Sequence, residues 1–158
     1  MDVKRGGKSS AFLCDSLIKT EVYIPTEKEE EQGIPPPPRY VSINMLLQTK
    51  VNNQIFFRKI DSLTLITQYN KPKKIAINPS LTRTINLISY KEALSKKSAE
   101  ERIYFHTISA PLFSKDGKKA YIQTGFYCGR LCGSGKAIFL EKLKGKWKIV
   151  KSYETWMS

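Results

Sequence analysis

The sequence contains few of the residues from which metal and cofactor sites are usually built. Its 158 residues include one histidine, His106, and three cysteines, Cys14, Cys128 and Cys132. A structural zinc site needs about four ligands, so all four of these side chains would have to take part. Because Cys14 lies far from the others in the chain, we expect no metal site and no cofactor.

Long apolar runs are also absent. No segment approaches the roughly 18 apolar residues of a membrane-spanning helix. The basic residues Lys4, Arg5 and Lys8 are followed by only a short apolar run, Ala11-Phe12-Leu13, whereas the apolar part of a secretory signal has about 7–15 residues. We therefore expect an exported protein of the periplasm or cell envelope if a signal has been removed, and otherwise a cytoplasmic one.

The ionisable residues form no recognisable catalytic set. His106 stands between Phe105 and Thr107 in a strand-like segment, which is more typical of a structural histidine than of a catalytic one. The carboxylates after residue 40 are spread over predicted turns, a helix and a hairpin. The run Gly133-Ser134-Gly135-Lys136 resembles a phosphate-binding loop but lacks both its first glycine and the hydroxyl residue after the lysine. Enzymatic activity is therefore not expected.

Acidic residues are scarce in one part of the chain. Overall, 14 Asp and Glu stand against 27 Lys and Arg, which gives a net charge of +13 at pH 7. Residues 1–40 have a net charge of −1, and residues 41–158 have one of +14. Such a surface attracts anionic partners. Most of the basic residues are lysines, however, and lysine suits diffuse solvation better than the bidentate recognition that arginine provides.

Composition separates the first 38 residues from the rest. The stretch from Glu27 to Glu31 is acidic, and Pro35 to Pro38 favour an extended polyproline II conformation and exclude helix. We predict a flexible acidic and proline-rich arm over 1–38, with one short element near Leu13 to Ile24, and a single basic α+β domain over 39–158. The proline run is interpreted as a rigid lead-in, the alternative being a ligand for an SH3-type groove.

The middle of the chain predicts short strands and one helix. Runs rich in β-branched and aromatic residues predict strands over 40–48, 54–60, 63–67 and 74–77. Asn52-Asn53 predicts a hairpin turn, because asparagine tolerates positive φ. The stretch from Ser89 to Arg102 predicts a helix that lies on a sheet, with Ser89 as N-cap and Glu92 at the capping-box position.

The last third predicts four further strands, over 103–113, 120–128, 136–143 and 147–153. In the final strand Trp147 and Ile149 alternate with lysines, so we expect one face on a core and a basic face in water. The predicted fold class is α+β, with a mainly antiparallel sheet, a C-terminal four-stranded meander and one helix packed on it.

Cys128 and Cys132 flank a tight loop, Gly129-Arg130-Leu131, and Gly133-Ser134-Gly135 follows. Cysteines at the ends of such a loop can reach the Cα separation of about 4.4–6.8 Å that a disulfide needs. The glycines supply the positive φ values that the loop would require. We predict a Cys128–Cys132 disulfide if the compartment is oxidising. One alternative is a zinc site, which the distance of Cys14 from the other ligands disfavours. The other is a redox pair, which the three-residue spacing and the lack of a following helix disfavour.

The C-terminal block also carries a resemblance. Its best-matching parts are Cys128-Gly129-x-x-Cys132-Gly133-x-Gly135, Gly145-Lys146-Trp147-Lys148-Ile149-Val150 and Trp156-Met157-Ser158. This block resembles small uncharacterised exported proteins and lipoproteins of the Bacteroidetes. The resemblance implies an exported, disulfide-containing, β-rich domain and brings no established activity. The sequence departs from that pattern at Leu13, since a lipoprotein would have a small residue before Cys14.

Three functions remain after these exclusions. The first is a non-catalytic exported binding or structural module with a disulfide-closed hairpin loop. The second is a basic domain that binds nucleic acid or an anionic surface. Its candidate anion-binding residues are Lys142, Lys144, Lys146, Lys148 and Lys151. The third is a thiol redox protein. We expect a monomer in each case.

Overall fold

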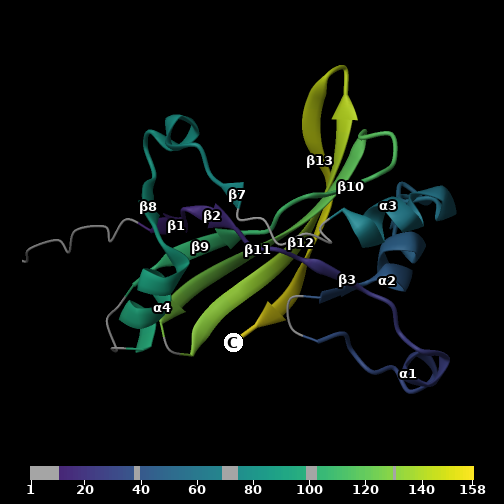
Figure 1. Ribbon diagram of the computed structural model, residues 1–158, viewed down its shortest axis with the longest axis horizontal. Coiled ribbons are helices and arrows are strands. Elements are labelled where there is room, and N and C mark those ends of the chain that lie inside the picture. Colours follow the sequence, from purple (N-terminus) through teal and green to yellow (C-terminus); the bar gives the residue numbers. More distant parts are fainter. Residues whose placement is uncertain (1–10, 38–39, 69–74, 99–102, 130) are drawn as a thin grey trace, which may run out of the picture.

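A seven-stranded sheet forms the centre of the fold (Figure 1). The computed structural model describes residues 11–37, 40–68, 75–98, 103–129 and 131–158. The order of strands in the sheet is β13-β12-β11-β9-β1-β8, with β10 also paired to β11. These strands are β1 (Phe12–Cys14), β8 (Asn86–Ile88), β9 (Phe105–Ile108), β10 (Leu112–Phe113), β11 (Lys119–Gly129), β12 (Cys132–Leu143) and β13 (Lys146–Met157).

The C-terminal meander predicted from the sequence is confirmed. Strands β9, β11, β12 and β13 pair antiparallel in this order. The strand predicted over 103–113 divides into β9 and β10, because Pro111 between them has no N–H to donate to a ladder. The last three strands of the meander are each longer than predicted.

Most strand pairs of the sheet are antiparallel, as predicted, but the sheet is mixed because it also contains parallel pairs. Strand β1 lies between β8 and β9 and pairs parallel with both. Its three residues belong to the stretch that the sequence assigned to a flexible arm over 1–38, yet Leu13 and Cys14 are buried. A parallel strand covered on both faces consists of consecutive apolar residues rather than alternating ones. Phe12-Leu13-Cys14 is such a run and is too short to stand out in the sequence.

The rest of the segment predicted as an arm also contains regular structure. Strand β2 (Ser16–Leu17) pairs with β7 (Ile75–Ala76), and β3 (Glu21–Tyr23) pairs with β4 (Tyr40–Ser42). Strand β7 lies within the strand predicted over 74–77, of which residue 74 is outside the described residues. Helix α1 (Glu27–Glu31) begins with a capping box between Thr26 and Glu29.

Helices replace most of the strands predicted between residues 40 and 67. Helix α2 (Ile43–Gln48) follows directly on β4, and the 3-10 helix η1 (Lys59–Asp61) leads into α3 (Ser62–Thr67). In α2, Ile43 and Leu46 are buried at the i, i+3 spacing of a helix. The expectation of a single helix is therefore also wrong. The hairpin at Asn52-Asn53 is confirmed, with both residues at positive φ between β5 (Lys50–Val51) and β6 (Gln54–Ile55).

The helix predicted from Ser89 is present as α4 (Tyr90–Ser98), just after η2 (Pro79–Thr82) and β8. The Ser89 hydroxyl accepts a hydrogen bond from the Glu92 N–H at 3.2 Å, as the predicted N-cap requires. Its predicted end, over 99–102, lies outside the described residues. No helix among the described residues is long and apolar enough to cross a membrane.

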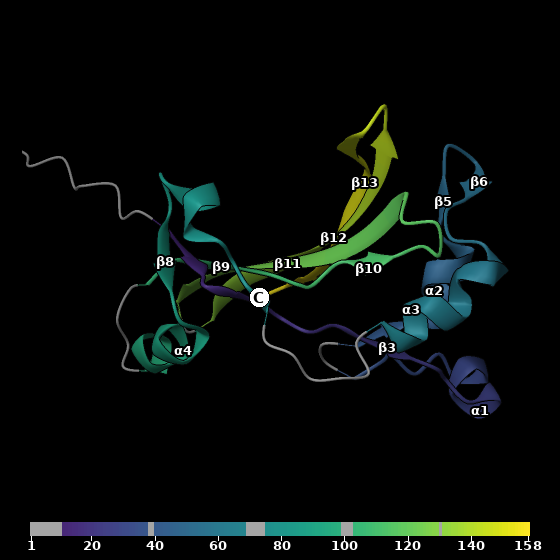
Figure 2. The same ribbon diagram turned by 45° about the horizontal axis from the view of Figure 1, so that its top comes forward.

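Two apolar clusters lie on one face of the sheet. The larger joins α2, α3 and the Phe56-Phe57 pair to Tyr121 of β11 and Phe139 of β12. The smaller joins α4 to β1, β8 and β9. Figure 2 shows α2 and α3 at one end of the sheet and α4 at the other. Strand β11 runs from one cluster to the other, with Tyr121 in the larger and Tyr127 packed against the smaller.

Candidate functional site

The disulfide predicted between Cys128 and Cys132 is present. It joins the end of β11 to the start of β12, with a Cα–Cα separation of 5.1 Å. Gly129 has a φ of 137° in the turn that it closes. The Leu131 side chain is 86% exposed at the tip of this turn, and Arg130 lies outside the described residues. The disulfide thus fixes the shape of a protruding hairpin turn.

Gly133 and Gly135 have a different role from the one expected. Neither has a positive φ. Instead, a Cβ atom on Gly135 would overlap Nε1 of Trp156, and one on Gly133 would lie 3.0 Å from the indole Cζ3. The Trp156 ring centroid is 5.6 Å from that of Tyr127. The indole therefore lies on a strip of β12 that has no side chains, next to the disulfide turn.

This arrangement has a signal in the sequence. Two glycines separated by one residue point to the same face of a strand. Gly133 and Gly135 follow this spacing, and Trp156 is near the end of the next strand in the chain. Two glycines on one face of a strand, followed by a tryptophan in the neighbouring strand, are the pattern from which the contact of Trp156 with β12 could be predicted.

A cavity of about 670 Å³ lies between the two apolar clusters. Its floor is the part of β11 between Tyr121 and Tyr127, where Gln123 and Gly125 face the same side. The described residues that line it are Ile18, Thr20, Pro35, Pro36, Pro37, Tyr40, Tyr90, Thr107, Ser109, Gln123, Thr124, Gly125, Tyr127, Thr155 and Trp156. We call this space the aromatic cavity. None of these residues carries a charge at neutral pH.

Hydrogen bonds and close packing hold the floor of the aromatic cavity. The Ser109 hydroxyl accepts a hydrogen bond from the Gln123 N–H at 2.8 Å. The Gln123 side-chain amide donates to the Tyr121 hydroxyl at 2.9 Å, and burial raises the pKa of Tyr121 well above its usual value. A Cβ on Gly125 would lie 2.7 Å from the Thr107 hydroxyl oxygen. The floor is therefore a preformed polar surface with little room for larger side chains.

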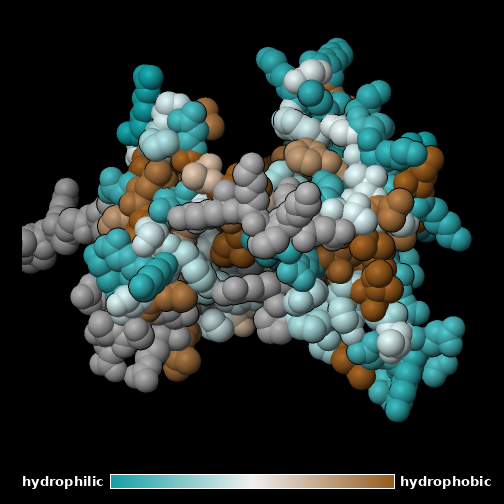
Figure 3. Space-filling view, in the orientation of Figure 1, coloured by the Kyte–Doolittle hydropathy of each residue, from teal (hydrophilic) through white to brown (hydrophobic). Residues whose placement is uncertain are grey.

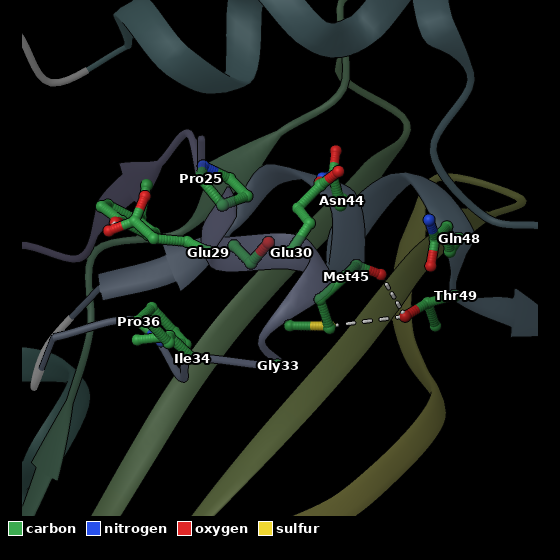
Figure 4. A pocket seen from close by; sticks show the side chains of 12 residues that line it. Pro25, Glu29, Glu30, Gly33, Ile34, Pro36, Asn44, Met45, Gln48 and Thr49 are labelled. Atoms are coloured by element: carbon green, nitrogen blue, oxygen red, sulfur yellow. Dashed lines mark hydrogen bonds between the residues drawn. The ribbon is translucent and has the colours of Figure 1, made fainter. Parts of the chain in front are cut away.

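A second cavity, of about 590 Å³, lies beside α1 and α2 (Figure 4). At its edge Glu29 accepts hydrogen bonds from the Tyr23 hydroxyl and from Thr26. These bonds lower the pKa of Glu29, with the Tyr23 hydroxyl as the largest cause. Pro36 lines both cavities, so the proline segment forms a wall between them.

No family model, curated protein or solved structure matches this chain. The resemblance to exported proteins of the Bacteroidetes therefore stays a prediction.

The five candidate anion-binding lysines do not form one surface. Lys142 lies opposite Trp147 in register, and its Nζ is 5.9 Å from the centre of the indole. Lys146 and Lys148 alternate with Trp147 and so point to the other face of β13. Lys151 donates to the Lys50 carbonyl at 2.8 Å. Lys144 is in the turn of the hairpin, at a φ of 49°.

The apolar face of the last strand is not on a core, contrary to the expectation. Trp147 is 40% exposed and Ile149 is 62% exposed. The reason is geometric, since the end of the β12–β13 hairpin extends away from the helices (Figure 2). The apolar cluster ends nearer the centre of β13, where Val150 and Tyr153 pack against it.

The remaining nucleophilic and titratable candidates lie outside the aromatic cavity. The His106 ring is 4.8 Å from that of Phe126, and partial burial lowers the pKa of His106. Cys14 is buried in the smaller cluster, where burial and, to a lesser extent, Asp15 raise its pKa to about 11. Within the described part of the chain, no three His, Cys, Asp or Glu side chains gather as a metal site would require.

Proposed function

We propose that the protein is a binding module for an uncharged ligand and that the aromatic cavity is its binding site. The observation that carries this proposal is the lining, which combines four aromatic side chains with hydroxyl and amide groups and no charge among the described residues. Its volume falls in the range of about 300–1,000 Å³ that is common for small-molecule sites. A charged ligand would lose its hydration there without gaining an ion pair from any of the described lining residues.

The chemistry of the lining favours a neutral carbohydrate. The faces of Tyr127 and Trp156 carry partial negative charge and attract the weakly positive C–H groups of a sugar ring. Ser109, Gln123 and Thr107 offer hydroxyl and amide groups from the floor for the hydroxyls of the same sugar. A purely apolar ligand would remove water from these polar groups without offering hydrogen bonds in its place.

The surroundings of Trp156 support a preformed site. The indole rests on β12 at Gly133 and Gly135, which have no side chains. The Cys128–Cys132 disulfide closes the β11–β12 hairpin just before these glycines. A ring held in place before binding loses less conformational entropy when the ligand arrives. A disulfide with this role also supports our proposal that the protein is exported, since disulfides persist in oxidising compartments.

Fluorescence of Trp156 provides a direct test. The chain has two tryptophans, so Trp147→Phe leaves Trp156 as the sole indole. This variant is titrated with neutral oligosaccharides of glucose, of mannose and of N-acetylglucosamine. We expect a saturable change in fluorescence with at least one of them. Its midpoint should not move between low and high salt, because screening affects only charged pairs.

Two variants complete the test. Trp156→Ala, measured by calorimetry, should weaken binding at least about tenfold, as removal of an aromatic anchor commonly does. Leu81→Ala removes a side chain that is 80% exposed on η2 and should leave binding unchanged. The proposal is wrong if none of the oligosaccharides binds, if Trp156→Ala binds as tightly as the parent, or if affinity falls with salt.

A further inference from the structure

The end of the β12–β13 hairpin has an exposed surface that the aromatic cavity does not use. We call it the hairpin-tip surface, and its residues are Lys142, Leu143, Lys144, Lys146, Trp147 and Ile149. Its three apolar side chains are 40% to 62% exposed. Figure 2 shows this hairpin rising from the sheet and away from α2, α3 and α4.

The antiparallel pairing of β12 with β13 holds the residues of the hairpin-tip surface in place. Lys142 is opposite Trp147, and Leu143 is opposite Lys146, with Lys144 and Gly145 in the turn. On one face the Trp147 ring is supported by Phe113 of β10, with 5.8 Å between ring centroids. Both faces of the tip therefore combine a large apolar side chain with a lysine.

The lysines of the tip are available for an external anion. Within the described part of the chain, no carboxylate lies within ion-pair distance of Lys142, Lys144 or Lys146. The nearest acidic residue in the ladder is Glu141, which lies opposite Lys148. Figure 3 shows mainly hydrophilic residues over this projecting end in that view. The tip thus carries Lys142, Trp147 and Ile149 on one face, Leu143 and Lys146 on the other, and Lys144 in the turn between them.

We propose that the hairpin-tip surface docks on an anionic lipid bilayer. Tryptophan prefers the boundary between headgroups and acyl chains. Exposed aliphatic groups such as Leu143 and Ile149 can enter the same boundary, while lysine stems extend so that the ammonium groups reach anionic headgroups. Each lysine near such a surface strengthens binding by electrostatic attraction.

Two other occupants fit the tip less well. Single-stranded nucleic acid would use Trp147 and the lysines but would give Leu143 and Ile149 no apolar partner. A second copy of the chain would bring together two tips of the same charge, and the net charge of +13 opposes this.

Vesicle sedimentation tests the proposal with the full chain. The vesicles are of phosphatidylcholine alone or of phosphatidylcholine with about 30% phosphatidylglycerol, at low salt. We expect sedimentation with the anionic vesicles only. In the Trp156→Phe background the Trp147 emission should shift to shorter wavelength on binding, as the indole leaves water.

Matched variants separate the surface from the overall charge. Lys142→Gln, Lys144→Gln and Lys146→Gln combined should weaken binding on the order of a hundredfold. Lys28→Gln, Lys59→Gln and Lys91→Gln combined remove the same charge from exposed positions on α1, η1 and α4, and should weaken it much less. Ile149→Ser should weaken binding, whereas Leu81→Ser should not.

Four outcomes would overturn the inference. They are no binding to anionic vesicles, equal weakening by the two lysine sets, full binding by Ile149→Ser, and binding to an oligothymidine with none to vesicles. Dimerisation in size-exclusion chromatography that Ile149→Ser abolishes would assign the surface to a second copy instead. Carbohydrate binding at the aromatic cavity stays measurable in the lysine, Ile149→Ser and Leu81→Ser variants, which keep Trp156 and the rest of the lining.

Discussion

At the scale of single residues, two glycines of β12 make room for Trp156, the main aromatic ring of the proposed binding site. Trp156 can approach the backbone of β12 closely because Gly133 and Gly135 have no side chains there. Gly125 likewise leaves room for the Thr107 hydroxyl on the floor of the aromatic cavity. Ordinary backbone angles at Gly133 and Gly135 mean that close approach, and not conformational freedom, requires glycine there.

Gly135→Ala should therefore move the indole. The new methyl group would overlap Trp156, and overpacking of this kind costs about 1–3 kcal/mol of unfolding free energy. The measurement is denaturant unfolding of Gly135→Ala, Trp156→Ala and the double variant. In the Trp156→Ala background the same glycine substitution should cost almost nothing. Additive costs would show that the indole does not occupy the strip.

At the scale of elements, two side chains fasten α3 to the start of the meander. The buried Asp61 carboxylate accepts hydrogen bonds from the N–H groups of Arg58 and Lys115, at 2.8 Å and 2.9 Å. At the other end of α3, the Gln68 side-chain amide donates to the Phe113 carbonyl and accepts from the Phe113 N–H. Gln68 thus pairs with β10 as a neighbouring strand would.

Gln68→Glu should break half of this pairing. A carboxylate cannot donate to the Phe113 carbonyl, and it repels that oxygen, so we expect a loss of about 1–3 kcal/mol in unfolding free energy. Gln54→Glu makes the same chemical change at an exposed position of β6 and is the matched control. Thermal or denaturant unfolding gives both values. Equal small effects would mean that the pairing contributes nothing to stability.

Elements with local signals were predictable, and those that depend on distant partners were not. The hairpins at Asn52-Asn53 and Lys144-Gly145 follow from turn residues that accept positive φ. The cap at Ser89 follows from its spacing to Glu92. By contrast, β-branched residues between 40 and 67 predicted strands where burial of Ile43 and Leu46 selects a helix. Strand β1 is stabilised by partners far along the chain, which no local pattern records.

The candidate site was predictable only in part, for the same reason. Two nearby cysteines are enough to predict the Cys128–Cys132 disulfide. The aromatic cavity combines Pro35, Tyr90, Thr107 and Trp156, which only the folded sheet brings together. The exposure of Trp147 also depends on where the helices end, and alternation along β13 does not contain that information.

At the scale of the whole molecule, the state of the three cysteines reports on folding. Cys128 and Cys132 are joined, and Cys14 is a free thiol buried in the smaller cluster. The thiolate is the reactive form. Because burial raises the pKa of Cys14 to about 11, this thiol stays protonated at the mildly alkaline pH of thiol assays.

The number of thiols that react should therefore differ between the folded and the denatured protein. Without reductant, the folded protein should react with a thiol reagent at a negligible rate. The denatured protein should show a single reactive thiol per chain. The pKa shift has a further consequence for stability, since the unfolded chain releases the Cys14 proton first. Stability should fall as the pH rises above the ordinary thiol value, by about 1 kcal/mol near pH 10, and Cys14→Ala should reduce that dependence, leaving the smaller share of the buried Tyr121 hydroxyl.

Three thiols in the denatured protein would show that the Cys128–Cys132 bond does not form. A rapid reaction of the folded protein would show that the smaller cluster opens without global unfolding.

The position of β1 has a consequence for how the chain is made. A ribosome releases residues 12–14 early, but both neighbours of this strand, at residues 86–88 and 105–108, are synthesised much later. Parallel pairing across such distances closes large loops and slows folding. During translation Phe12, Leu13 and Cys14 remain an unpaired apolar segment, which is the kind of segment that chaperones protect from aggregation. Strand β1 can therefore enter the sheet only after both of its neighbours have been synthesised.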